Sequence, residues 1–488
     1  MMVMRMLVAH LKTLARHAAI YGSADVFTNV INFILVPIIT RHLSPSDYGA
    51  LGILLLFGAM SKILFRMGLD SAFFRIYYDQ GTEHDRRLFT TTTLVATGTL
   101  SFSLFAVSAL LAEPIGRILL GPGQGTLVIL VAADTLLTGF TFLPMNLFRI
   151  QGRAGYFTVA SVLRNALNLG LKVALVVSGW GVAGVLWSDV ISACVFAVAL
   201  APTLLGNLGR GFSWGMLRKA ASFGLPKVPH GLAYQALNLA DRKLLDLLST
   251  RAEVGLYHVA YMFGTGVKFF LSAFELAWVP FAYSLLKRAD APTTLARIVT
   301  HAAAVLVSVG LLIAVLAREI LTLMTDPKYH AAYPVVPVVT LAHVIQGFFT
   351  LTGIGIGISK RAYYYPILTF AGAATNIGLN LLLIPRFGKM GAAWATVAGY
   401  AVLSGLGYYF GNRHYPIPFE WGRIGRIVLA AALCFGISCL SGDSLLAGLP
   451  IKLLALALFP LTLYGLGYFR ASEIQRLRDL LVRPGSEP

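Results

Sequence analysis

The sequence predicts an all-α polytopic membrane protein, and three features of its composition lead to this class. Of the 488 residues, 57% are hydrophobic and only 12% are charged, whereas soluble domains carry about 25% charged residues. Apolar stretches of roughly 20 residues, the length that a helix needs to cross a bilayer, recur along the chain. No charged residue lies between Asp189 and Arg210 or between Lys452 and Arg470. The net charge of +18 fits the Lys and Arg that cytoplasmic loops collect, so it does not require a nucleic-acid partner.

The hydrophobic runs predict about fourteen membrane-spanning helices joined by short connections. In order, the predicted spans cover residues 17–40, 47–68, 88–112, 125–147, 155–178, 181–206, 220–249, 253–286, 293–317, 331–358, 362–385, 388–411, 424–441 and 450–469. Alternate connections, counted from the N-terminus, hold more than twice as many Lys and Arg as the others. Because cytoplasmic loops are the positive ones, both termini are predicted to be cytoplasmic.

The connections between the spans are too short to form a catalytic domain. The sequence has no Walker A motif and no H-E-x-x-H motif. Its three cysteines, Cys194, Cys434 and Cys439, lie in apolar spans without metal-binding or disulfide spacing. We therefore expect no enzyme activity, no metal and no resident cofactor. Any energy that the protein needs would come from a proton or sodium gradient or from the membrane potential.

Two stretches, FGAMSK at 57–62 and FGTGVK at 263–268, indicate an internal duplication. Their Phe, Gly and Lys residues recur at an offset of 206, and LSPSDYG before the first stretch corresponds to LSTRAEVG before the second. Further positions match in order: Gly49 with Gly255, Gly181 with Gly388, Gly184 with Gly391, and the i, i+4 pair Arg164 and Asn168 with Asn376 and Asn380. Each copy holds six spans, so both copies enter the membrane from the same side and are related by an axis along its normal.

The duplication divides the predicted chain into two parallel six-helix lobes and three smaller parts. We expect an N-terminal interfacial segment (1–16), an N-lobe of helices 1–6 (17–210), a C-lobe of helices 7–12 (211–412), helices 13 and 14 (413–470) and a cytoplasmic tail (471–488). Transporters built from such repeats bind their substrate near the membrane midplane, between the two halves.

Two lysines inside apolar spans are the main candidates for a binding site. Lys62 and Lys268 occupy equivalent positions of the two copies. A charged side chain at a helix centre costs about 2.5–3.5 kcal/mol on insertion scales, and such residues usually face a bundle interior or a water-filled cavity. The glycines one turn earlier, Gly58 and Gly264, should leave room beside each ammonium. Snorkelling of the side chain to the interface is the alternative explanation.

Polar residues on neighbouring spans have the spacing of side chains that share one helix face. They are Asp25, Asn29 and Asn32 on the first span, Lys227, Tyr234, Asn238 and Asp241 on the seventh, Lys62 with Arg66 on the second, and Lys268 with Glu275 on the eighth. The cations Lys62, Arg66, Lys227 and Lys268 outnumber the carboxylates Asp25 and Glu275, so a cavity between these spans is predicted to attract an anion. Arg66 and Lys227 are also placed to snorkel. Pairing between helices is an equal alternative for Asp134, Arg164, Lys172, Asp189 and His343.

Three long stretches resemble one transporter family. They are RHLSPSDYGALGILLLFGAMSKILFRMGLDSAFFR, ADRKLLDLLSTRAEVGLYHVAYMF and TNIGLNLLLIPRFGKMGAAWATVAGY. They resemble the oligosaccharide flippases of the polysaccharide transporter (Wzx-like) family, within the multidrug/oligosaccharidyl-lipid/polysaccharide exporter superfamily. The resemblance covers nearly the whole chain and implies a V-shaped bundle of two six-helix lobes plus two helices. It also implies that a polyprenyl-pyrophosphate-linked oligosaccharide crosses the bacterial inner membrane by alternating access, for O-antigen, capsule or exopolysaccharide synthesis.

The resemblance gives the candidate residues their expected roles. For the pyrophosphate, charge-assisted partners would be Lys62, Lys268, Lys227 and Arg66. For the sugars, hydrogen-bonding partners would be Asn29, Asn32, Tyr234, Gln235 and Asn238. For a coupling ion, candidate carboxylates are Asp25, Glu275, Asp189 and Asp241. The expected partners are the lipid-linked substrate, the bilayer, a polysaccharide polymerase and a chain-length regulator.

Three alternatives have different consequences. A multidrug exporter of the same superfamily would carry cationic drugs and should have an acidic cavity, whereas this one is predicted to be basic. A lipid II flippase would have a basic cavity of its own and is not excluded by the sequence. A membrane polymerase or ligase would need a large extracytoplasmic loop, and every outer connection here is short.

Overall fold

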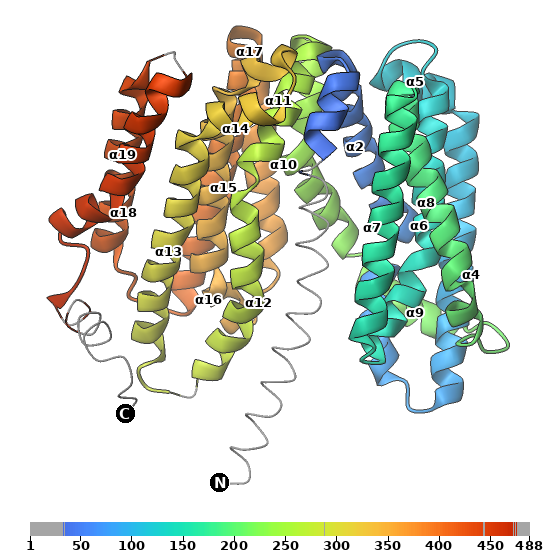
Figure 1. Ribbon diagram of the computed structural model, residues 1–488. Helices are drawn as coiled ribbons and strands as arrows, with labels where there is room; N and C mark the ends of the chain where they lie inside the picture. The colour runs from blue at the N-terminus through green and yellow to red at the C-terminus, as the bar shows by residue number, and fades with distance from the viewer. Residues whose placement is uncertain are drawn as a thin grey trace. The chain divides into compact units, whose positions relative to one another are not determined.

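The computed structural model describes residues 33, 35–286, 288–442, 445–471, 473 and 475, and the regular elements in these ranges are all helices (Figure 1). The chain falls into two compact units. The first unit comprises the described residues up to Val259 together with Met324–Ala332 and Tyr365–Gly399. The second unit comprises Ala260–Leu323, Tyr333–Tyr364 and the described residues from Tyr400 onward. The domain boundaries that follow the sequence repeat stay a prediction.

Long helices alternate with short ones along the chain. The long helices are α2 (Pro45–Arg66), α4 (Glu83–Leu110), α6 (Gly125–Ile150), α7 (Ala154–Val177), α8 (Gly181–Leu205), α10 (Lys227–Leu248), α11 (Arg251–Gly264), α12 (Val267–Leu285), α13 (Ala291–Val315), α15 (Val335–Thr352), α17 (Tyr364–His414), α18 (Trp421–Ser438) and α19 (Leu445–Gly465). The short elements are α3 (Leu69–Ile76), η1 (Tyr77–Asp79), α5 (Ala112–Leu119), α9 (Trp214–Gly224), α14 (Ala317–Met324), η2 (Pro327–Ala332), α16 (Ile354–Ile358) and η3 (Cys439–Ser441).

Within the described part of the chain, ten spans are long and apolar enough to cross a membrane, and the bent pair α11 and α12 gives an eleventh. The prediction of a multi-pass α-helical membrane protein is therefore confirmed, but the count of fourteen is not. The first predicted span, 17–40, lies largely outside the described residues. Helix α10 is not among the ten because Asp241, Arg242 and Lys243 interrupt its apolar run.

One predicted span differs from the expectation, and two adjacent ones are recorded as a single broken helix. The predicted eighth helix, 253–286, is not continuous: α11 and α12 meet at a 47° bend. Helix α17 contains the predicted eleventh and twelfth spans, and its backbone leaves the helical region at Gly388 (φ +53°). Asn376 Nδ2 donates to Thr396 Oγ1 at 3.3 Å across this break, so α17 folds back on itself as a hairpin. The equivalent Gly181 at the start of α8 has φ +57°, a conformation that favours glycine.

The duplication appears as matched helix contacts inside each unit. In both copies, the second and third spans approach the fourth at glycines, where a Cβ would meet a neighbouring side chain. The matched positions are Gly58 beside Val131 and Gly139 beside Ser101 in the first copy, and Gly264 beside Val339 and Gly347 beside Leu306 in the second. The prediction that Gly58 and Gly264 leave room for an ammonium is therefore wrong, because a neighbouring helix occupies that space.

One matched pair of the predicted repeat is out of register by a helical turn. Asn168 on α7 donates to Asp189 and Ser192 on α8, and Asn376 makes the corresponding contact with Thr396 across the α17 hairpin. Asn168 thus corresponds to Asn376 instead of Asn380. Asn376 and Asn380 lie one helical turn apart on the same face, so the spacing alone could not decide which of them aligns with Asn168.

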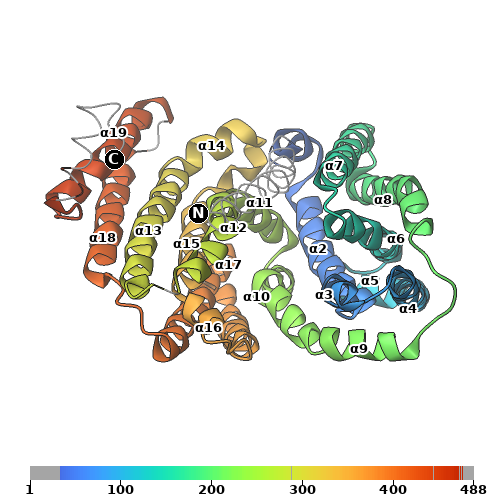
Figure 2. The same ribbon diagram turned by 90° about the horizontal axis from the view of Figure 1, so that it is seen from below.

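In the first unit, α2, α4, α7 and α8 pack with α6 (Figure 1), and α9 lies beside α3 and α4 at the edge of this bundle when the helices are viewed end on (Figure 2). A cluster that includes Leu69, Phe73, Phe89 and Leu147 joins α3, α4 and α6 there. The two copies also meet reciprocally in this unit: a Cβ at Gly49 would overlap the backbone of Arg251, and one at Gly255 would overlap that of Pro45.

In the second unit, α18 and α19 pack against each other and against α13. Buried Arg423 pairs with Glu420 at 3.0 Å and with Glu473 at 2.7 Å. Burial tends to raise the pKa of Glu420, but a hydrogen bond from Thr300 and the charges of Arg423 and Arg470 outweigh it, so the pKa of this carboxyl is lowered. The pKa of Glu473 is lowered in the same way, against the effect of burial, by the Arg470 N–H and by Arg423.

A carboxylate at equivalent positions of α5 and α14 has different partners in the two copies. Glu113 accepts hydrogen bonds from the backbone N–H groups of Gly123 (2.7 Å) and Gly125 (3.2 Å), before and at the start of α6. Glu319 instead pairs with Lys452 on α19, with an Nζ–Oε1 distance of 2.7 Å. This pair therefore helps to attach the last span to the second copy of the repeat.

Candidate functional site

Lys62 lies in the interior of α2, where a capping box fixes the start of the helix. Ser44 Oγ accepts a hydrogen bond from the Asp47 N–H, and the Asp47 carboxylate accepts one from the Ser44 N–H. Lys62 Nζ lies 3.3 Å from Asp134 Oδ2 on α6; the lysine side chain is 45% exposed and the aspartate side chain 14%. An ammonium has three N–H donors, so Lys62 keeps donors for a further ligand while Asp134 orients it.

Arg66 follows Lys62 by one turn and is the last residue of α2. Its Nη2 donates to the Thr138 carbonyl at 3.3 Å, and its Nη1 lies 3.8 Å from Asp70 Oδ2. The guanidinium also lies 5.4 Å from the centre of the Phe142 ring. Its Nε is buried and has no hydrogen-bond partner among the described residues. Arg66 is thus held by contacts that satisfy only part of its five-donor group.

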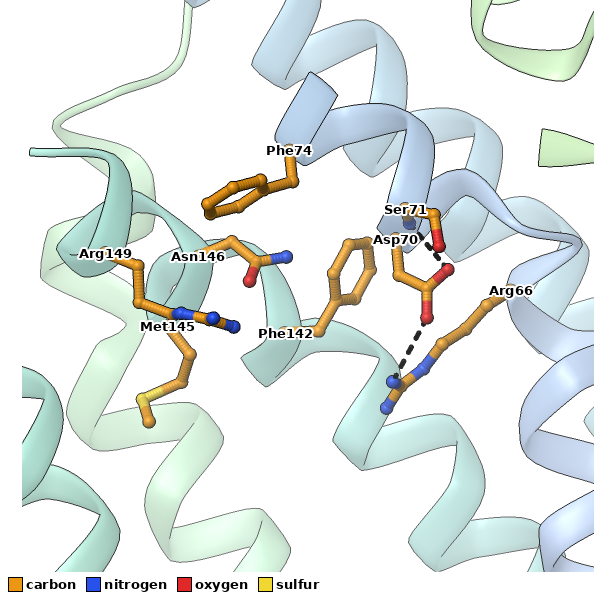
Figure 3. Close-up of a pocket in the computed structure, with 8 residues that line it drawn as sticks. All are labelled: Arg66, Asp70, Ser71, Phe74, Phe142, Met145, Asn146 and Arg149. Atoms are coloured by element: carbon orange, nitrogen blue, oxygen red, sulfur yellow. Dashed lines mark hydrogen bonds and ion pairs between the residues drawn. The ribbon is translucent and has the colours of Figure 1, made fainter. Parts of the chain in front are cut away.

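A hollow of about 480 Å³ lies beside Arg66, between the end of α2, the start of α3 and the last turns of α6 (Figure 3). Its lining residues are Arg66, Asp70, Ser71, Phe74, Phe142, Met145, Asn146 and Arg149. Arg149 lies on the opposite side of the hollow from Arg66, with Asn146 and Phe142 between them (Figure 3). The hollow is of the size of typical small-ligand sites.

Asp189, a predicted coupling residue on α8, is paired within the first unit. Lys172 Nζ lies 2.9 Å from its Oδ1, and the Asn168 amide donates to the same oxygen at 2.9 Å. Asn168 also donates to Ser192 Oγ at 2.9 Å. For Lys172 and Asp189, the alternative of pairing between helices is the observed one.

The predicted polar stripe of α10 divides between exposed and buried positions. Lys227 is exposed at the first turn and its Nζ lies 4.0 Å from the centre of the Phe223 ring. Tyr234 is exposed and Gln235 is half-buried. Asn238 is buried and donates to the Tyr234 carbonyl at 2.6 Å. The polar stripe is therefore exposed in the N-terminal half of α10 and buried in its C-terminal half.

Asp241 lies at the centre of a fully buried polar network in the first unit. Its Oδ1 pairs with Arg242 Nη1 at 3.1 Å, and its Oδ2 accepts a hydrogen bond from the Tyr257 hydroxyl at 2.6 Å. Thr396 Oγ1 lies 3.5 Å from the same Oδ2 and connects the carboxylate to Asn376. Asn380 donates to Asn376 Oδ1 at 3.0 Å, and its own side-chain oxygen has no partner among the described residues. The network gathers several oxygen atoms of the kind that bind hard cations.

Lys268 and Glu275 belong to the second unit. Lys268 is the second residue of α12, directly after the bend that separates α11 from α12, and is half-buried. Glu275 is exposed and accepts a hydrogen bond from Thr350 Oγ1 at 2.7 Å. Asp25, Asn29 and Asn32 lie outside the described residues.

The first unit brings Lys62 together with Asp134, and Lys172 with Asp189. That Lys62 and Lys268 share one cavity stays a prediction. The sequence reading missed Arg149 and Asn146 in the hollow, since both stand at the end of a span where flanking polar residues are ordinary. It also missed Arg242, although consecutive charges at 241–243 within an apolar run are a signal of a buried network.

Known structures share this fold of repeated helices. The structure is similar to that of the lipid II flippase MurJ in an inward closed conformation, with a TM-score of 0.72 and 12% identity over 92% of this chain and 99% of that one. It is also similar to a multidrug resistance MATE family transporter of the MOP superfamily, with a TM-score of 0.62 and 16% identity over 82% of this chain and 96% of that one. Residues 38–334 match the family described as polysaccharide biosynthesis protein, so the chain belongs to this family.

The chain is also similar to two curated proteins, one of which is described as a glycan biosynthesis flippase. A probable low-salt glycan biosynthesis flippase, Agl15 of Haloferax volcanii, is 20% identical over 320 residues, which are 64% of this chain and 67% of that protein. An uncharacterized membrane protein of Methanocaldococcus jannaschii is 31% identical over 107 residues, and this match spans only 20% of its length. The relatives and structural neighbours with a described activity are flippases and transporters, which agrees with the expectation that the chain is not an enzyme.

Proposed function

We propose that this protein is a flippase that moves a polyprenyl-pyrophosphate-linked oligosaccharide from the cytoplasmic to the outer leaflet of a bacterial inner membrane, with both termini in the cytoplasm. Its product would feed the synthesis of a surface polysaccharide such as O-antigen, capsule or exopolysaccharide, through a polymerase and a chain-length regulator. The observation that carries the proposal is Lys62: a half-exposed ammonium inside an apolar span, steadied by a carboxylate from another helix.

The proposed mechanism is alternating access around a basic binding site. The pyrophosphate is held by Lys62 and Lys268, with Arg66 and Lys227 toward the helix ends, through charge-assisted hydrogen bonds. The proposed hydrogen-bonding partners of the sugars are Tyr234, Gln235, Asn238, Asn29 and Asn32. The lipid tail stays in the bilayer. The membrane potential contributes about 2.3 kcal/mol per unit charge per 100 mV to the movement of such a charged substrate.

We further propose that transport is coupled to a sodium or proton gradient through Asp241, with Asp189, Asp25 and Glu275 as the other candidates. What supports Asp241 is its burial among the oxygen atoms of Tyr257 and Thr396, with the Asn380 side-chain oxygen close by in the same network. We expect Asp241→Asn to remove the dependence of transport on the imposed ion gradient, because the amide lacks the negative charge and the second carboxylate oxygen that a coupling cation would bind. The exposed Asp290→Asn is the matched control. Unchanged gradient dependence in Asp241→Asn would refute this coupling residue.

The experiment that tests the central proposal is polymer export in a host that lacks its own oligosaccharide flippase. We expect Lys62→Ala and Lys268→Ala each to impair export at least tenfold while the protein still accumulates in the membrane, since each removes a charged partner of the pyrophosphate. Lys219→Ala on the exposed face of α9 is the control. Normal export by the Lys62→Ala/Lys268→Ala double variant would remove the basis of the proposal.

A lipid II flippase is the second candidate, favoured by the structural similarity to MurJ. Lipid II also carries a pyrophosphate, so the same lysines would serve it. The two substrates are separated by complementation: growth of a host depleted of its lipid II flippase would support the second candidate, whereas restored polymer export without that growth supports the first.

A further inference from the structure

The hollow beside Arg66 has the composition of an anion site. Two arginines and one carboxylate line it, which leaves a formal positive charge when Asp70 is ionised. Arg66 and Arg149 approach the space from opposite sides, and the Asn146 side chain lies between them (Figure 3). An anion placed there would meet a guanidinium on each side, the arrangement that suits phosphate oxygens.

Two groups at the hollow, on Arg66 and Asn146, have donors available to a ligand. Arg66 Nε is buried without a hydrogen-bond partner among the described residues, and Arg66 lies beyond hydrogen-bond distance of Asp70, at 3.8 Å. The Asn146 amide, one turn before Arg149 on α6, makes no hydrogen bond within the described part of the chain. Arg149 is positioned by aromatic rings: its guanidinium lies 5.3 Å from the centre of Phe74 and 5.8 Å from that of Phe157. A bound phosphate group would supply acceptors for the Arg66 and Asn146 donors.

The apolar part of the lining points to a lipid. Phe74, Phe142 and Met145 lie next to the donors, and Phe74 is itself exposed. A soluble anion would gain no free energy from contact with this apolar surface. The first carbons of a lipid tail would bury part of it beside the headgroup. The ligand that fits both halves of the lining is therefore a phosphate ester on a hydrocarbon chain.

We propose that this hollow is a second binding site, which takes the phosphate-bearing headgroup of a lipid before it reaches Lys62. Arg66 follows Lys62 by four residues, about 6 Å of helix rise, so a diphosphate can pass from one to the other along a single face of α2. The identity of the lipid as the transported substrate rests on the function proposed above. The chemistry of the site does not, because bilayer phospholipids carry the same group.

The test measures binding of inorganic pyrophosphate by calorimetry to the protein in phosphatidylcholine nanodiscs, in a Lys62→Gln/Lys268→Gln background that removes the central lysines. Arg149→Gln removes one guanidinium without touching the contacts of Arg66, and we expect it to weaken binding about tenfold or more. Arg153→Gln, an exposed arginine four residues further on and outside the hollow, is the matched control and should bind as the background does.

A second pair of variants protects the test against misfolding. Ser71 is exposed at the rim of the hollow, so Ser71→Asp adds a negative charge without removing a packed side chain, and Ser71→Asn is its neutral control. We expect Ser71→Asp to weaken binding by a similar factor and Ser71→Asn to leave it unchanged. Equal pyrophosphate affinity in Arg149→Gln, Ser71→Asp and the background would overturn the proposal, and so would the absence of binding to the background protein.

Nanodiscs doped with polyprenyl diphosphate or with phosphatidylglycerol identify the source of the headgroup. Displacement of pyrophosphate by polyprenyl diphosphate alone assigns the site to the substrate, displacement by both assigns it to phosphate lipids in general, and displacement by neither overturns the lipid assignment. Failure of the proposed function is distinguishable: a protein with Arg149-dependent binding that exports no polymer keeps this site and loses that function. A protein that exports polymer but binds pyrophosphate independently of Arg149 keeps the proposed function and loses this site.

Discussion

The reciprocal glycine contact between the two copies makes a quantitative prediction. A methyl group at Gly49 would overlap the carbonyl oxygen of Arg251, and one at Gly255 would overlap that of Pro45. Both obstacles are backbone atoms, so no rotamer change can relieve them. Overpacking costs typically 1–3 kcal/mol, and we expect the upper end, about 3 kcal/mol. The gain in helix propensity from Gly to Ala returns about 1 kcal/mol, which leaves a net loss of about 2 kcal/mol for each variant.

The measurement is the free energy of unfolding of the purified protein in mixed micelles, titrated with a denaturing detergent. Gly378→Ala is the control, because a Cβ there meets nothing within 4 Å and only the propensity gain remains. The double variant Gly49→Ala/Gly255→Ala should lose less than the sum of the single losses, since one methyl already separates the helices that the other would push apart. If Gly49→Ala gains stability as Gly378→Ala does, the close approach of α2 and α11 is not the native packing.

Two further predictions concern buried and interfacial charges. Tyr257→Phe should lower the unfolding free energy by about 1.5–3 kcal/mol, because it removes a hydrogen bond to the buried Asp241 carboxylate; a loss below 0.5 kcal/mol in the same titration would show that the carboxylate is satisfied without it. The lowered pKa values of Glu420 and Glu473 mean that their pairing stabilises the fold above the ordinary glutamate pKa of about 4.3 and is lost as the pH falls below it. Arg423→Gln should flatten this acid-dependent loss in thermal unfolding measured from pH 7 down to pH 3, and an unchanged pH profile would contradict the assignment.

The sequence predicted the bounds of those spans that depend only on the hydrophobicity of their own residues. The predicted 125–147 and 155–178 became Gly125–Ile150 and Ala154–Val177, because hydrophobic length is a local property that the bilayer imposes. The turn residues Gly181 and Gly388 were matched correctly. A left-handed backbone conformation favours glycine, so such a turn is recognisable in the sequence. The bend between α11 and α12 was not predicted, although Gly264 and Gly266, two poor helix formers, lie at it.

The partners of the charged side chains could not be predicted from the sequence. Asp134 lies 72 positions after Lys62, and only the packing of α6 on α2 brings the two together. The pair Lys172 and Asp189 was weighed only as one possibility, because a charge inside a span can face a cavity or another charge with the same sequence pattern. Which cations remain available to a substrate is thus decided by tertiary contacts.

The different partners of Glu113 and Glu319 bear on how self-sufficient each half of the molecule is. In the first half, the Glu113 carboxylate accepts hydrogen bonds from two nearby backbone N–H groups. All of its hydrogen-bond partners here thus belong to the same half of the chain. In the second half, the same ancestral position depends on Lys452, nearly the last charged residue within the helices. A chain shortened before α19 would therefore leave an orphaned carboxylate only in its later half.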